Sequence, residues 1–320
     1  MRLFANANFD FIGHRRVAFA LSGAAVALSI LVALFWQISR GSWLNYGVDF
    51  TGGTIVQVAF HEETSVGELR ETVGTVVPGA EITRFGGENE FLVRAPEFAE
   101  GGQEVGNVIV DALAERYGAA GFDVSRIEAV GPKIGGELQQ RALLAILLSF
   151  VGILAYLAFR FEWRFGVAAV IALAHDIVVT LGIISAFRME VLLPIVAAVL
   201  TIVGYSINDK IVVFDRAREN LKKSGRREDM ATILNRSINE TLPRTIMTSV
   251  TTLATLLALF MFGGETIRDV ALIMFVGILI GTYSSIFVAS PALLAITQRW
   301  KPQSKGAKKP ARSTRSSVAV

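Results

Sequence analysis

The chain has 320 residues, of which 52% are hydrophobic and 18% are charged, and its formal net charge is +3. A mean hydropathy of +0.50 indicates a membrane protein and excludes a single water-soluble domain of ordinary composition. The absence of cysteine excludes disulfides, thiol nucleophiles and cysteine-ligated metal clusters.

Six segments are apolar over about the 20 residues that a membrane-spanning helix needs. They are residues 17–38, 142–159, 165–187, 191–214, 242–262 and 270–296. The first follows His14, Arg15 and Arg16, as the core of a signal peptide would, but its apolar run is too long and no small-residue cleavage site follows it. We therefore expect an uncleaved membrane anchor after a short N-terminus, residues 1–16.

Residues 39–138, between the first two spans, have the pattern of a soluble α+β domain. Strands are predicted at 54–60, 81–85, 90–94 and 122–130, and helices at 64–76 and 103–117. Ser65 and Glu68 have the spacing of a helix-capping box. The order β-α-β-β-α-β is typical of the ferredoxin-like fold. His61 stands beside two glutamates, which indicates a solvated loop and not a metal site.

Lys and Arg near the spans segregate to one side of the membrane. Seven basic residues lie between Arg216 and Arg236, and seven more lie between Arg299 and Arg315. The positive-inside rule therefore places both termini in the cytoplasm and residues 39–138 in the periplasm. The predicted fold class is a polytopic α-helical membrane protein with six transmembrane helices and a periplasmic α+β ferredoxin-like domain between the first and the second.

The remaining boundaries follow from the same pattern. Residues 139–298 are predicted to form a five-helix transmembrane bundle, with a cytoplasmic loop at 215–240. Within that loop, residues 228–239 have one apolar face and are expected to form an interfacial helix. Residues 299–320 are basic and rich in Ser, Lys, Pro and Gly, which predicts a disordered cytoplasmic tail.

Charged residues inside the apolar spans are the features most indicative of function. Asp209 and Lys210 lie in the fourth span, and Arg244 lies just inside the fifth. A charge at membrane depth costs roughly 2.5–3.5 kcal/mol on insertion scales, so it is retained mainly where it faces protein or a wet cavity. Asp209 and Arg244 have similar depths on consecutive antiparallel helices, which predicts an ion pair. Lys210 is near enough to the boundary to extend towards water, and no chemistry is assigned to it.

Polar residues accompany this predicted pair. Tyr205 and Ser206 are expected on the face of Asp209, while Thr248 and Thr251 continue the face of Arg244 and lead to a hydrated path. One interpretation is that Asp209 is a protonatable switch with Arg244 as its charge partner. The other is a static pair that fixes the helix register, with hydroxyls as interhelical hydrogen-bonding groups.

Two further features lie within the bundle. His175 and Asp176 in the third span are interpreted either as a proton relay or as structural hydrogen-bonding groups. Adjacent helical residues point about 100° apart and do not ligate one metal as an i, i+4 pair would. In the last span, small residues at a spacing of four predict close helix packing. They are Gly277, Gly281, Ser285 and Ala289.

Several local motifs together resemble one family. After the first span the sequence contains Asp49, Gly52 and Gly53, and before the second it contains Gly131, Pro132 and Gly135. The fourth span continues through Asn208 and Asp209 to Asp215 and Arg216, and Arg244 follows Thr241-Leu-Pro at the start of a Thr-rich span. This combination is similar to the SecF family, the smaller membrane subunit of the bacterial SecDF protein-export complex in the RND superfamily.

The resemblance implies a protein of the bacterial inner membrane with six spans, which assists preprotein export after the SecA ATPase has acted. Implied partners are SecD, the SecYEG channel, YajC, an unfolded preprotein and membrane lipid, with no nucleic acid. The energy source is the proton-motive force, or sodium in some bacteria, and no cofactor, metal or enzymatic activity is expected. The residues that match the family's ion-coupling pair are Asp209 and Arg244. Lys210 departs from the threonine that the family pattern has after this aspartate, so the coupling ion stays open.

Three other functions are considered. A small-solute RND-type transporter half would need larger outer loops than one domain of about 95 residues. An intramembrane hydrolase built on His175 and Asp176 would need a nucleophile or a further metal ligand at the same depth. A structural assembly subunit would tolerate an apolar replacement of Asp209 and Arg244.

Overall fold

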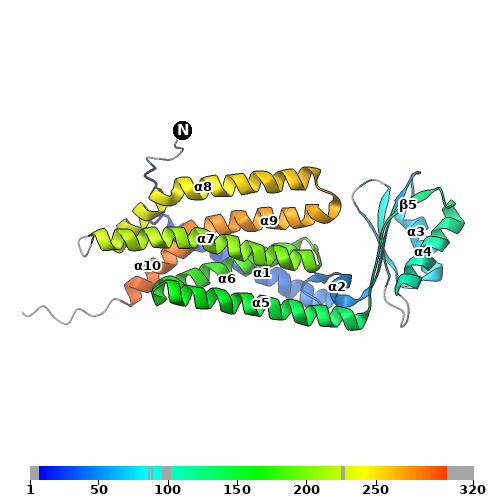
Figure 1. The fold of residues 1–320 in the computed structure, drawn as a ribbon, viewed down its shortest axis with the longest axis horizontal. Coiled ribbons are helices and arrows are strands. Elements are labelled where there is room, and N and C mark those ends of the chain that lie inside the picture. The colour runs from blue at the N-terminus through cyan, green and yellow to red at the C-terminus, as the bar shows by residue number, and fades with distance from the viewer. Residues whose placement is uncertain (1–6, 86, 88, 96–101, 225–227, 301–320) are drawn as a thin grey trace, which may run out of the picture.

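The structure is a computed structural model that describes residues 7–85, 87, 89–95, 102–224 and 228–300. It consists of a long helix bundle with a small sheet domain attached to one end (Figure 1). The C-terminal end of α7 and the last helix, α10, lie at the end of the bundle that is farthest from the sheet domain (Figure 1). The predicted tail lies almost entirely outside the described residues.

Within the described residues, six helical segments are long and apolar enough to cross a membrane, as predicted. They are α1 (Arg15–Arg40), α5 (Pro132–Arg160), α6 (Trp163–Ala186), α7 (Leu193–Ser224), α8 (Met230–Phe262), and a last segment composed of α9 (Glu265–Ser284), a π-helical turn (Ser285–Ala289) and α10 (Ser290–Arg299). Several helices extend beyond their apolar cores because polar residues at the ends continue the helical hydrogen bonding.

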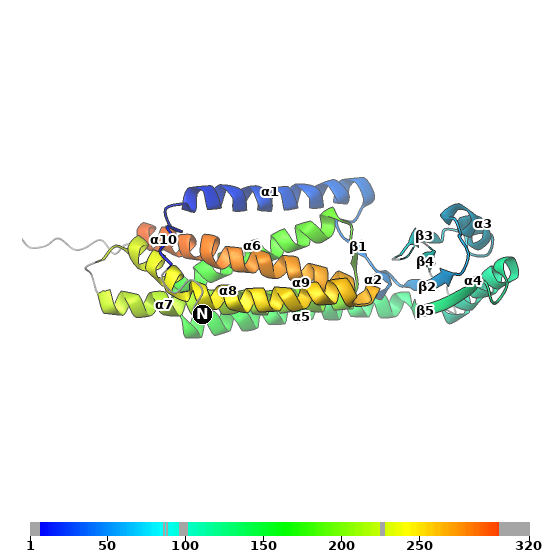
Figure 2. The ribbon, with the colours of Figure 1, turned by 90° about the horizontal axis from the view of Figure 1, so that it is seen from above.

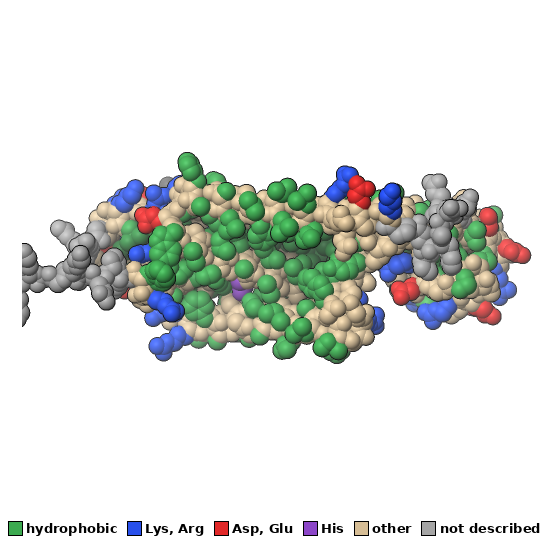
Figure 3. All heavy atoms as spheres, turned by 90° about the horizontal axis from the view of Figure 1, so that it is seen from below, with side chains coloured by type: hydrophobic (Ala, Val, Ile, Leu, Met, Phe, Trp, Pro, Cys, Tyr) green, Lys and Arg blue, Asp and Glu red, His purple; other side chains and the backbone are tan. Residues whose placement is uncertain are grey.

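Helices α6, α7 and α9 form the centre of the bundle, whereas α1, α5 and α8 are covered mainly on one side. Half of the apolar window of α6 is buried, compared with 6% for α5. Figure 2 shows α1 and α5 on opposite sides of the bundle. Apolar side chains cover the middle of the visible surface in Figure 3, and charged side chains gather towards the ends. This is the surface that a lipid environment requires.

The centre is closely packed because α9 presents glycine to α7. A Cβ on Gly277 would lie 2.4 Å from Cδ1 of Ile202, and one on Gly281 would lie 2.8 Å from Oγ of Ser206. Both distances are too short for a real side chain. The small-residue packing predicted for the last span is therefore confirmed at these two positions.

The sheet domain has the predicted ferredoxin-like topology. Its elements are β2 (Gly53–Phe60), α3 (Val66–Val76), β3 (Glu81–Arg84), β4 (Glu90–Ala95), α4 (Gly102–Tyr117) and β5 (Phe122–Val130). The strands are antiparallel in the order β3-β4-β2-β5, and the core beneath α3 and α4 includes Val58, Leu69, Phe91 and Leu113. The predicted capping box is confirmed, because the Glu68 backbone N–H donates to Ser65 Oγ and the Ser65 N–H donates to Glu68 Oε2.

A short junction joins this domain to the bundle. β1 (Asn45–Tyr46) pairs in parallel with β6 (Glu190–Val191), and α2 (Val48–Thr51) follows β1. Ile55 and Leu92 lie on the sheet face opposite α3 and α4. They form one apolar cluster with Val48, and Leu192 packs against this cluster. The domain is therefore seated on the loop that connects α6 and α7.

One predicted element was wrong. Residues 228–239 do not form a separate interfacial helix, because α8 runs without interruption from Met230 to Phe262 with Pro243 inside it. Proline has no N–H for the carbonyl four residues earlier, which bends a helix without having to end it. Figure 1 shows α8 bending towards its N-terminal end.

Candidate functional site

The centre of the bundle contains a fully buried ion pair between α6 and α7. Lys210 Nζ lies 2.8 Å from Asp176 Oδ2, and the two side chains are 0% and 1% exposed. A buried charge of either sign is tolerated only when it is paired and hydrogen-bonded. The expectation that Lys210 reaches the membrane boundary is therefore wrong, because its ammonium points into the bundle and has a definite partner.

Two serines complete the surroundings of this pair. Ser206, on α7, donates to Asp176 Oδ2 at 2.6 Å, and Ser284, at the end of α9, donates to the same oxygen at 2.8 Å. Lys210 Nζ in turn donates to the hydroxyl of each serine. Three helices are thus joined at one carboxylate oxygen, and all three ammonium protons have acceptors.

His175 borders the pair without entering it. Its Nδ1 lies 3.0 Å from Asp176 Oδ1, and its Nε2 is buried without a hydrogen-bond partner among the described residues. The structure therefore brings His175 and Asp176 together, as expected for either a relay or a structural hydrogen bond.

Asp209 lies on a different face of α7 from Lys210. Asp209 is only 3% exposed, and its Oδ2 has no hydrogen-bond partner among the described residues. Lys210, the next residue, and Arg244 on α8 are both close enough to interact electrostatically with it. No ion pair within 4.0 Å joins the two in the described part of the chain, so the direct pair predicted from the sequence is not formed in this structure.

The polar face of α8 points mainly away from the rest of the chain. Arg244, Thr251 and Thr255 are exposed, and Thr248 is half-buried. The threonine hydroxyls donate to carbonyls of the preceding turn of their own helix. Tyr205 on α7 contacts this helix through its hydroxyl, which lies 3.2 Å from Thr252 Oγ1. The expected hydrated path is therefore not enclosed within this chain.

The sequence placed Ser206 on the face of Asp209, but the structure groups it with Lys210 and Asp176. Ser206 and Lys210 stand at i, i+4 on α7, a spacing that places both on one helix face. Ser284, in contrast, is joined to them only by tertiary packing, so no local pattern indicated it. Within the described residues, no group of three or more His, Cys, Asp or Glu side chains is placed to hold a metal ion.

The glycine-rich motif after α1 lies at the junction between the bundle and the sheet domain. Asp49 Oδ2 accepts a 2.8 Å hydrogen bond from the backbone N–H of Leu193, the first residue of α7. Gly53 has φ +122, and a Cβ there would lie 2.7 Å from the Ala95 carbonyl oxygen. The motif thus turns the chain tightly into β2 while Asp49 satisfies the start of the helix that carries Asp209.

The other glycine motif begins α5. Gly131 is extended and precedes Pro132, the first residue of that helix. Gly135, one turn on, packs directly on the first motif, because a Cβ there would lie 3.0 Å from the Gly52 nitrogen. The two motifs therefore form one contact at which α5 meets the junction.

An ion pair also crosses this junction from the sheet domain. Arg94 Nη2 lies 2.6 Å from Glu190 Oε2, in the loop between α6 and α7. Burial raises the pKa of Glu190 above its usual value, although the Arg94 guanidinium acts in the opposite direction. The ion pair therefore ties the sheet domain to the loop before α7, while the Asp49 cap ties the junction to the first residue of α7.

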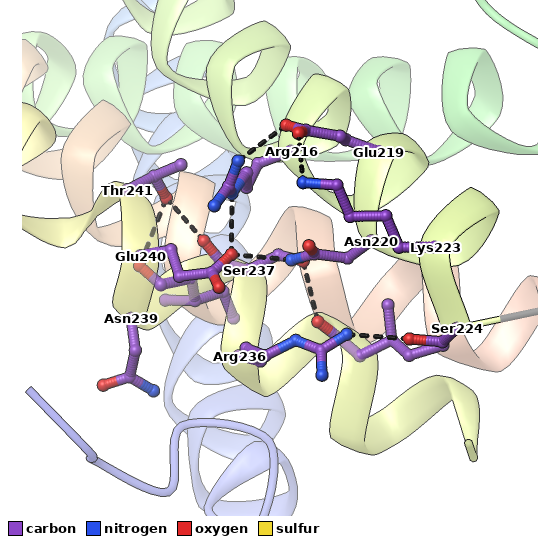
Figure 4. Close-up of polar contacts among 12 residues, drawn as sticks. Arg216, Glu219, Asn220, Lys223, Ser224, Arg236, Ser237, Asn239, Glu240 and Thr241 are labelled. Carbon is purple, nitrogen blue, oxygen red and sulfur yellow. Dashed lines mark hydrogen bonds and ion pairs between the residues drawn. The ribbon is translucent and has the colours of Figure 1, made fainter. Parts of the chain in front are cut away.

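The remaining motif residues lie at the other end of α7. Asp215 accepts a 2.6 Å hydrogen bond from Arg160 at the end of α5. Arg216 contacts Glu240 on α8, and Asn220 donates to Ser237 and Glu240 (Figure 4). Asn208, by contrast, is exposed on α7. Asp215 and Arg216 therefore join α7 to α5 and to α8, a role that their sequence positions alone did not indicate.

The comparisons with known proteins agree with this arrangement. The family model for the protein export membrane protein SecD/SecF, C-terminal, matches residues 109–299, and that for the SecD/SecF GG motif matches residues 41–63. The protein translocase subunit SecF of Gemmatimonas aurantiaca is 44% identical over 307 residues, which cover 94% of this chain and 90% of the relative. That of Vibrio alginolyticus is 44% identical over 294 residues, with 91% of each chain covered.

Solved structures show the same relationship. The crystal structure of SecDF, a translocon-associated membrane protein from Thermus, matches with a TM-score of 0.79 and 40% identity over 93% of this chain. SecDF in its super-membrane-facing form matches with a TM-score of 0.66. The chain spans about 40% of the length of these SecDF chains. From its motifs, its six spans and its relatives, the chain belongs to the SecF family of protein translocase subunits.

Proposed function

We propose that this chain works with a SecD-type partner to convert the proton-motive force into movement that assists preprotein export. The observation that carries the proposal is Asp209, a buried membrane carboxylate. One of its oxygens has no hydrogen-bond partner among the described residues, and a cation, Arg244, stands on the neighbouring helix. Protons are the proposed coupling ion, and no cofactor takes part. The chain acts as a transport subunit and not as an enzyme.

The proposed cycle begins with protonation of Asp209. Loss of its negative charge removes the attraction to Arg244, so α7 and α8 change their relative position. Because Asp49 caps α7 and Arg94 holds Glu190, movement of α7 is passed to the sheet domain. The lysine pair does not need to open in this cycle, since Lys210 and Asp176 lie on a separate face.

The partner is proposed to cover the exposed polar faces. Arg244, Thr251 and Thr255 on α8 and Asn208 on α7 are exposed within spans, where lipid contact would be costly. A second membrane subunit placed there would enclose the hydrated path that this chain leaves open. SecYEG, YajC and an unfolded preprotein are proposed as further partners, with both termini in the cytoplasm of the bacterial inner membrane.

The test is export into inverted membrane vesicles that contain this chain and its SecD-type partner. Asp209→Asn is expected to remove the stimulation of export by a proton gradient while the two subunits still co-purify. Glu219→Gln is the matched control, because it makes the same change on the same helix at an exposed position. Full stimulation in Asp209→Asn would overturn the proposal and favour a structural assembly subunit.

A further inference from the structure

The ammonium of Lys210 lies in a small cage of oxygen atoms. Asp176 Oδ2 lies 2.8 Å from Nζ, Ser284 Oγ lies 3.0 Å away and the Ser206 carbonyl lies 3.4 Å away, with the Ser206 hydroxyl in direct contact. One carboxylate, two hydroxyls and one carbonyl are a ligand set typical of hard cations.

The cage is built from parts that do not depend on lysine for their positions. Ser206 and Ser284 both donate to Asp176 Oδ2, so the carboxylate holds them in place. Gly281 has no side chain, which allows α9 to approach Ser206 closely. Asp176, Ser206 and Ser284 are each at most 2% exposed. His175 Nδ1 fixes the second oxygen of Asp176.

We propose that Asp176, Ser206 and Ser284 form a monovalent-cation site that the chain keeps filled with its own ammonium. Shortening Lys210 would open this site to Na⁺ or K⁺. In the intact chain the site has no room for a free ion, so an alkali cation does not act there. This inference goes beyond the export function and does not depend on it, because it concerns cation binding alone.

Charge balance supports a cation of single charge. Asp176 contributes the single acidic group of the cage, and Lys210 neutralises it. The other titratable neighbours are His175, on α6, and Asp209, on α7, which interacts electrostatically with Lys210 but has no hydrogen bond to the cage among the described residues. A divalent ion would leave an uncompensated positive charge in the bundle, which is unfavourable at this depth.

The experiment measures the unfolding temperature of full-length Lys210→Ala in mild detergent, in chloride salts of equal ionic strength. Na⁺ or K⁺ is expected to raise it by about 5 °C relative to N-methylglucamine, which is too large to enter. Propylammonium, which has the three carbons and the ammonium that the substitution removes, is expected to do the same. The ion with the lower midpoint concentration identifies whether the cage suits Na⁺ or K⁺.

Two controls keep the result specific. The wild-type chain is expected to show no difference among these salts, because its site is filled. Lys210→Ala combined with Asp176→Asn removes the negative charge and is expected to lose the cation response. The proposal is overturned if Lys210→Ala responds equally to all salts, or if it fails to fold in every cation while the double variant folds.

Discussion

Asp176 and Lys210 come from different helices and neutralise each other where neither side chain has contact with solvent. Asp176→Asn is expected to destabilise the chain by about 3–5 kcal/mol, because it leaves an ammonium buried without a counter-charge. Thermal unfolding of the full chain in detergent checks this.

Asp176→Leu with Lys210→Met should recover much of that loss, because it removes both charges while retaining apolar volume. A double variant as unstable as Asp176→Asn would mean that packing, and not charge, dominates at this position.

Gly281 is expected to tolerate no side chain. Gly281→Ala places a Cβ 2.8 Å from Ser206 Oγ and should cost about 1–3 kcal/mol through overpacking between α7 and α9. Gly152→Ala on α5 is the matched control, since a Cβ there meets nothing within 4 Å. That control should be neutral or stabilising because alanine favours a helix. Equal effects of the two substitutions on the unfolding temperature would contradict the packing argument.

Asp49 is expected to matter through the start of α7. Asp49→Ala removes the acceptor for the Leu193 N–H and should cost about 0.5–2 kcal/mol, the usual range for a lost helix cap. Hydrogen exchange at the first turn of α7 should accelerate in this variant. Asp49→Asn keeps an acceptor oxygen and should exchange nearly as slowly as the wild type; rapid exchange in Asp49→Asn would instead assign the effect to the charge.

Glu190 gives a prediction about pH. Its pKa in the folded chain is raised by burial above the ordinary 4.5, so the folded state binds a proton more tightly than the unfolded state. The stability it contributes is complete below the ordinary value and is lost as the pH rises through the raised one.

Glu190→Gln should therefore gain stability relative to the wild type as the pH rises from below the ordinary value of 4.5 towards neutrality. The measurement is the difference in unfolding temperature between the two proteins at each pH. A difference that is constant over this range would show that the pKa of Glu190 is not raised in the folded chain.

The spans and the sheet domain were predictable because each rests on a local signal. A run of apolar residues indicates a span, and alternation with turn residues indicates strands, as at 54–60 and 90–94. The helix before Pro243 was misplaced because a break was expected where the polar loop meets the apolar span. The continuous α8 shows that helical hydrogen bonding can pass through such a boundary.

The site was only partly predictable. Asp209 and Arg244 stand out as charges in apolar spans, and they are brought near each other, but their direct pairing was wrong in this conformation. The partnership of Lys210 with Asp176 depends on how α7 rotates against α6, which depth alone does not give. Ser284 stands 78 residues after Ser206 in the chain and enters only through helix packing, so no spacing rule identifies it.

Helix α7 is 32 residues long and unbroken, which corresponds to a rod of roughly 48 Å. One end is fastened to the glycine-rich junction through Asp49, and towards the other end Arg216 is paired with Glu240 on α8. A pivot of a few degrees about the mid-membrane serines would therefore carry both tips sideways by about 2 Å in opposite directions. A small rotation at the level of one carboxylate is thereby sufficient to shift surfaces on both sides of the lipid layer at once.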